Sequence, residues 1–135
     1  MLQPKRTKYR KEFRGRMKGS DIRGSQISVG EFGLKAMTRA WVTAKQLESA
    51  RKAIVRETKR KGKLWLRVFP QKPYTKKPDE VGMGKGKGDV EGYVFVVKPG
   101  RILFELGGVD EYVAMSAFKR AADKLPIRTR IIKKD

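Results

Sequence analysis

The clearest periodic pattern of apolar residues begins after Thr43. Leu47, Ala50 and Ile54 recur at spacings of three and four, which places them on one face of an α-helix. The helix is expected to begin at Thr43, because "TAKQ" has the form of a capping box. Gly62 is expected to end it. The charged residues of this segment fall mostly outside the apolar stripe, so the helix has one apolar and one basic side.

A second helical pattern runs from about Asp110 to Lys124. The residues expected on its buried stripe are Met115, Phe118, Ala122 and Leu125. Pro126 follows and closes the helix.

Other parts of the chain alternate between apolar and polar residues, which predicts strands. These parts are residues 25–42, 64–69 and 127–134. The apolar runs 93–97 and 102–106 are joined by "KPGR" and predict a β-hairpin. Two helices and these strands predict an α+β fold: a mainly antiparallel sheet or sandwich-like barrel with both helices packed on it.

Two segments lack apolar periodicity. Residues 1–24 contain nine basic and two acidic residues, which predicts a basic N-terminal arm that orders against its partner. Residues 70–92 contain three prolines and five glycines and are expected to form a long loop. The alternatives are an ordinary disordered terminus and a disordered hairpin tip. The expected organisation is the arm followed by one α+β RNA-binding domain, residues 25–135.

Charge narrows the class of partner. The chain has 34 Lys and Arg residues against 14 Asp and Glu, a net charge of +20. Such an excess favours a polyanion as the partner: nucleic acid first, an anionic membrane surface second. The absence of Cys and His excludes a disulfide framework, a zinc site built on those residues, and Cys or His catalysis. No apolar run approaches membrane-spanning length, so we expect a soluble protein.

The stretch "GMGKGKG" at 82–88 resembles a phosphate-binding loop at first sight. It fails the Walker pattern, because Gly86-Lys87 is followed by Gly88, which has no hydroxyl. It also fails the dinucleotide spacing, and a strand rather than a helix is expected after it. A basic finger placed along a phosphate backbone is the better interpretation, with Lys85 and Lys87 as its contacts.

No constellation for acid–base catalysis is evident, because the nearest carboxylate pairs are sequence neighbours that point apart. Tyr9 and Tyr74 lie in basic, loop-like surroundings and are candidates for base stacking. The polar side of the first helix is either a solvated face or a backbone contact for RNA or DNA. Only Glu48 and Glu57 oppose eight bases in residues 44–63, which favours the contact.

Several longer stretches together resemble one family: "MLQPKRTKYRK", "TAKQLESARKAI", "KGKLWLRVFPQKPYTKKP", "MGKGKG" and "VKPGRILFELGG…AFKRAADKLPIRTR". They are similar to the sixteenth protein of the bacterial large ribosomal subunit, over nearly the whole chain. The resemblance implies an α+β sandwich-like domain bound to large-subunit ribosomal RNA near the aminoacyl-tRNA site. It also implies a structural and assembly role without catalysis, and an arm and loop that extend toward tRNA and the peptidyl-transferase region.

Charge and resemblance together provide the candidate contacts. Those expected on ribosomal RNA are Lys5, Arg6, Lys8, Arg10, Lys11, Arg14, Arg16, Lys18, Arg51, Lys52, Arg56, Lys59, Arg60, Lys63, Arg128 and Arg130. The loop expected near tRNA comprises Lys76, Lys77, Met83, Gly84, Lys85, Gly86, Lys87 and Gly88. The chain departs from many family members at Gly82, where they carry arginine.

The expected partners are therefore large-subunit ribosomal RNA, tRNA and neighbouring ribosomal proteins in the cytoplasm. No cofactor, metal, membrane or small-molecule substrate is expected. The alternatives are a free RNA chaperone or architectural nucleic-acid-binding protein, and, less consistent with the residues, an RNA-processing enzyme.

Overall fold

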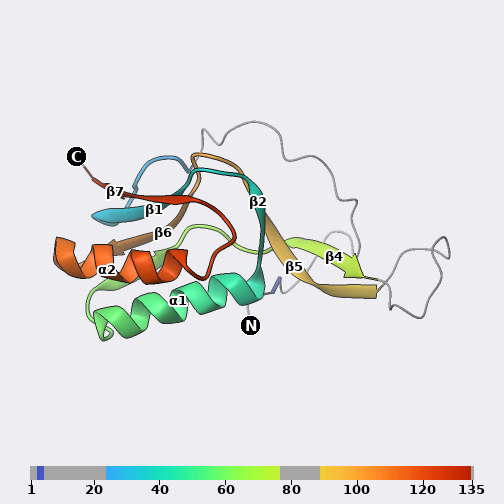
Figure 1. Cartoon of the computed structure of the whole chain (residues 1–135), viewed down its shortest axis with the longest axis horizontal. Helices are drawn as coiled ribbons and strands as arrows, with labels where there is room; N and C mark the ends of the chain where they lie inside the picture. Colours follow the sequence, from blue (N-terminus) through green and yellow to red (C-terminus); the bar gives the residue numbers. More distant parts are fainter. Residues whose placement is uncertain (1–2, 5–23, 77–88, 135) are drawn as a thin grey trace.

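Two antiparallel sheets and two helices make up the part of the chain described by the structure, a computed structural model covering residues 3–4, 24–76 and 89–134 (Figure 1). The elements are β1 (Phe32–Ala36), β2 (Ala40–Thr43), α1 (Ala44–Thr58), β3 (Lys63–Leu66), β4 (Lys72–Lys76), β5 (Asp89–Val97), β6 (Ile102–Gly107), α2 (Glu111–Ala122) and β7 (Thr129–Lys133). The strand orders are β3-β6-β1-β7 and β2-β5-β4. The α+β prediction is confirmed, and neither sheet closes into a barrel.

The core lies between the first sheet and the two helices, which cover the same side of it (Figure 1). Leu47 and Ile54 of α1 meet Phe118 of α2 and Phe104 of β6, all with no exposed surface. The predicted stripe of α2 is wrong at Met115, which is 42% exposed. Phe118 of the predicted stripe is buried, and the rest of the buried side of α2 is formed by small residues, Ala114, Ala117 and Ala121, which allow its backbone to approach its neighbours closely.

The start of α1 follows the prediction and its end does not. Thr43 Oγ1 accepts from the Gln46 N–H at 3.1 Å, and Gln46 Oε1 accepts from the Thr43 N–H at 2.9 Å, so the capping box is confirmed. The helix ends at Thr58, before Gly62, because Lys59 already adopts a left-handed conformation. Gly62 serves the next turn: it has φ +73°, and a Cβ there would lie 2.3 Å from the Gly107 carbonyl oxygen.

The hairpin prediction is wrong, because β5 and β6 belong to different sheets. β5 pairs with β2 and β4, whereas β6 pairs with β1 and β3. The turn between them bonds to the end of β1: the Gly100 N–H donates to Ala36 O at 2.8 Å, and the Ala36 N–H donates to Arg101 O at 2.8 Å. These bonds fix the turn to the end of β1, where the chain passes from the sheet of β5 to the sheet of β6.

The prediction of a loop over residues 70–92 is wrong at both ends, which form strands; residues 77–88 lie outside the described ranges. β4 and β5 pair as far as Lys76 and Asp89, and Figure 1 shows this ribbon extending from the body. Pro73 is tolerated because β4 is an edge strand. The Tyr74 ring lies over Gly92, where a Cβ would be 3.0 Å from it.

Candidate nucleic-acid interface

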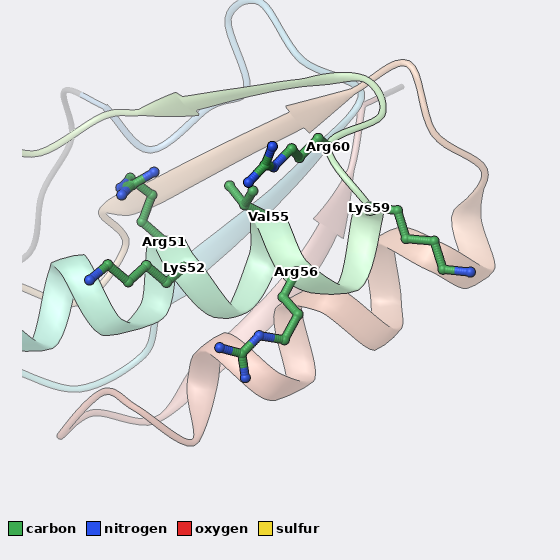
Figure 2. A pocket seen from close by; sticks show the side chains of 6 residues that line it. All are labelled: Arg51, Lys52, Val55, Arg56, Lys59 and Arg60. Atoms are coloured by element: carbon green, nitrogen blue, oxygen red, sulfur yellow. The ribbon is translucent and has the colours of Figure 1, made fainter.

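A cationic depression lies along α1. It has a volume of about 580 Å³ and is lined by Arg51, Lys52, Val55, Arg56, Lys59 and Arg60 (Figure 2). Five of these six side chains are basic, and four of the five are exposed. The predicted basic side of the helix therefore forms one surface, and α1 holds it rigidly because the opposite face of the helix is in the core.

The acidic residues of α1 do not neutralise this surface. Glu48 pairs with Arg51 (Nε to Oε1, 3.2 Å), and that hydrogen bond lowers the pKa of Glu48. Glu57 instead accepts from α2, at 2.6 Å from Ser116 Oγ and 2.9 Å from Arg120 Nε. Within the described ranges, the ion pairs leave the other bases of the depression without an acidic partner: Lys52, Arg56, Lys59 and Arg60.

Two of these bases stand in an unfavourable backbone conformation. Lys59 has φ 54° and Arg60 has φ 64°. Left-handed conformations cost residues with a Cβ roughly 1–2 kcal/mol, and glycine avoids that cost. Two adjacent basic residues therefore occupy positions where glycine would be more stable. Such strain often marks functional sites, and here it places both charges at the end of the depression.

A buried carboxylate holds the segment from which the predicted arm leaves the body. Glu105 of β6 has no exposed surface, and its Oε1 accepts from the backbone N–H groups of Ser28 (3.1 Å), Val29 (2.9 Å) and Gly30 (2.8 Å). Its other oxygen pairs with Arg67. Burial would raise the pKa of Glu105, but the three backbone N–H groups and the guanidinium outweigh it, and the pKa is lowered.

At the other end of the same segment, Gly24 bonds to Ile102 and lies against Arg101. The Ile102 N–H donates to Gly24 O at 2.8 Å, and a Cβ on Gly24 would lie 2.9 Å from Arg101 Cζ. Arg67 Nη1 also donates to Gln26 O at 3.2 Å. Residues 24–30 are thus fixed to β6 and to the residues after β3. The sequence did not indicate Glu105 or Arg67 as important, because their roles depend on contacts across the fold.

Some of the remaining predicted contacts lie within the described residues, and the others lie outside them. Lys63, Arg128 and Arg130 are exposed. Lys76 ends β4. The others lie outside the described residues: Lys5, Arg6, Lys8, Arg10, Lys11, Arg14, Arg16, Lys18, Lys77, Met83, Gly84, Lys85, Gly86, Lys87 and Gly88.

Two features of the described residues bear on other functions. No group of three or more Asp or Glu residues is arranged to hold a metal ion there. In the same ranges, no helix has the length and apolar character needed to cross a membrane.

The fold and the cationic surface, which the acids of the described ranges do not neutralise, define a small basic α+β protein suited to a polyanionic partner. Comparison with known proteins narrows this class. The family described as ribosomal protein L16p/L10e matches residues 4–132. Large ribosomal subunit protein uL16 of Thermosipho africanus is 61% identical over 134 residues, covering 99% of this chain and 94% of the relative. The uL16 protein of Thermus thermophilus is 58% identical over 135 residues, covering 100% and 96%. The chain therefore belongs to the L16p/L10e family of ribosomal proteins.

Proposed function

We propose that this chain is a structural constituent of the large ribosomal subunit in the cytoplasm, where it binds ribosomal RNA and contacts tRNA near the aminoacyl site. It acts by position and charge and contributes to subunit assembly, without catalysing a reaction. Its partners are large-subunit ribosomal RNA, tRNA and neighbouring ribosomal proteins. Membership of the family supports the place in the subunit, and the surface chemistry supports the mode of binding.

One observation carries the mode of binding: the depression along α1 and its C-terminal end has four exposed bases that have no acidic partner among the described residues. An exposed lysine or arginine that neutralises a phosphate releases condensed counterions, and this release favours binding. Because α1 is anchored in the core, Lys52 and Arg56 keep a fixed spacing, and Lys59 and Arg60 follow directly at the end of the helix. Such contacts fix the position and orientation of the protein on RNA.

The ribosomal assignment is tested by sedimentation of cell extract. The protein should sediment almost wholly with large subunits. A mostly free pool would support an RNA chaperone or architectural protein and refute the assignment.

The role of α1 is tested by removing charge. The variant Lys52→Gln/Arg56→Gln/Arg60→Gln should bind isolated large-subunit ribosomal RNA more weakly. It should also reduce the slope of log affinity against log salt concentration by about 0.7–0.9 for each lost phosphate contact.

The control for α1 removes three exposed charges that do not line the depression: Lys45→Gln/Lys119→Gln/Lys124→Gln. Both variants have the same net charge, so only a specific role for the depression makes the first one weaker. Equal affinities and equal slopes would show that the depression is not a contact.

A further inference from the structure

A second, smaller pocket lies where the chain crosses twice between the two sheets. It has a volume of about 330 Å³. One crossing follows β3 and leads to β4, and the other follows β5 and leads to β6. We call it the junction pocket; its lining includes Leu66, Arg67, Phe69, Gln71, Phe95 and Arg101.

The junction pocket combines an accessible aromatic ring with an amide and two cations. Phe69 is 36% exposed, because the chain leaves the first sheet after Leu66. This differs from the sequence-based prediction, which extended the strand through Phe69. Gln71 is also exposed. None of the lining residues is acidic, and the nearby carboxylate of Glu105 is buried and occupied by its own partners.

The cationic wall of the pocket is preorganised. The pairing with Glu105 and the bond to Gln26 O hold Arg67. Arg101 Nη2 donates to Arg67 O at 3.2 Å, and its guanidinium lies 5.4 Å from the centre of the Phe95 ring. Side chains fixed in this way lose little freedom when a ligand binds, so more of the interaction energy appears as affinity.

We propose that the junction pocket binds one unstacked nucleotide of the RNA, with its base against Phe69 and its phosphate near the arginine wall. This inference rests on the proposed function and adds a site to it. The volume is near the lower end of the range for small-ligand sites, about 300–1,000 Å³, which suits a single nucleotide. A base in a duplex hides its faces in the stack, so only a nucleotide from a loop or bulge can use the ring.

The location of the pocket fits this ligand. The two arginines of its wall contact residues 24–30, which follow the predicted arm in the sequence: Arg67 donates to Gln26 O, and Arg101 lies against Gly24. Gln71 is followed directly by β4, the first strand of the extended ribbon. An RNA strand that contacts both residues 24–30 and the β4–β5 ribbon would therefore pass over the pocket.

The test replaces Phe69 in the full chain and measures binding to isolated large-subunit ribosomal RNA. Phe69→Ala should weaken binding about 5- to 150-fold, the usual effect of losing one stacked base. Phe69→Trp should retain affinity, and Phe69→Leu should be weakened because it keeps apolar bulk without the aromatic face. The matched control is Tyr112→Ala, which removes an aromatic side chain that is 83% exposed on α2.

Salt dependence separates stacking from charge. Phe69→Ala should shift the affinity without changing the slope against log salt concentration, because stacking releases no counterions. Chemical probing of the RNA should identify one unpaired nucleotide whose reactivity changes with the unaltered protein and Phe69→Trp, but not with Phe69→Ala. Because Phe69 is partly exposed, urea unfolding should show that Phe69→Ala remains folded.

Three outcomes are decisive. Unchanged affinity and an unchanged probing pattern for Phe69→Ala would overturn the nucleotide pocket and leave the proposed RNA binding intact. Equal binding by Phe69→Leu and the unaltered protein would overturn stacking as its mechanism. Failure of the unaltered protein to bind the RNA would instead refute the proposed function.

Discussion

Replacement of Glu105 by Gln tests whether one buried carboxylate fixes residues 28–30, which follow the predicted arm in the sequence. The substitution keeps the shape and one oxygen, but it removes the charge that serves three backbone N–H groups and Arg67. Breaking a buried ion pair by removing one partner costs about 3–5 kcal/mol. The Arg67 side chain is 22% exposed and regains some hydration, so we expect the lower end, about 3 kcal/mol. That is a large share of the stability of a small domain, about 5–15 kcal/mol.

Urea unfolding of the full chain, followed by circular dichroism, measures this loss. Arg67→Gln/Glu105→Gln should recover more than about 1 kcal/mol of the loss, since two amides can bond to each other without an unpaired charge. Glu48→Gln is the control, because it breaks a pair on the surface and should cost under about 1 kcal/mol. A free energy of unfolding within about 0.5 kcal/mol of the unaltered protein for Glu105→Gln would refute the reasoning.

Three further predictions concern backbone strain, acid stability and the loop. Lys59→Gly should leave the free energy of unfolding unchanged or raise it by up to about 1 kcal/mol, whereas Lys52→Gly inside the helix should lower it by about 1 kcal/mol; urea unfolding distinguishes them. Because the pKa of Glu105 is lowered in the folded state, its contribution is complete above the unfolded value of about 4.3 and is lost as pH falls through the folded value. At pH values below about 4.3, the free energy of unfolding should therefore decrease as the pH is lowered. The decrease should be smaller in Glu105→Gln, which lacks the titrating carboxylate. Lys85→Ala/Lys87→Ala should impair tRNA accommodation, measured on isolated ribosomes, more than incorporation into large subunits; the reverse result would make the loop an assembly anchor.

Local physics explains which elements could be predicted from the sequence. The capping box at Thr43 involves residues only three apart, and the stripe of Leu47, Ala50 and Ile54 reflects the helix period alone. Both are present in the structure. The excess of bases over acids in residues 44–63 is likewise a property of composition, and it correctly located the cationic side of α1. The family resemblance also lies in the sequence, and the comparison confirms it.

Contacts between distant segments decided the rest. "KPGR" has the composition of a hairpin turn, but hydrogen bonds to Ala36 send β5 and β6 into different sheets. Proline and glycine suggested a loop after residue 70, but pairing with β5 stabilises β4 as an edge strand. Met115 fits the helix period, yet α2 buries the face that carries Phe118 and three alanines and leaves Met115 exposed.

The sequence by itself determined the class of this protein: basic, α+β, with a cationic helix. Only the tertiary structure showed that Glu105 is buried beneath residues 28–30, and that Phe69 turns outward where the chain changes sheets. The physical reason is the same in both cases. A carboxylate is stable in the interior only when distant donors converge on it, and the exposure of a ring depends on which segments cover it.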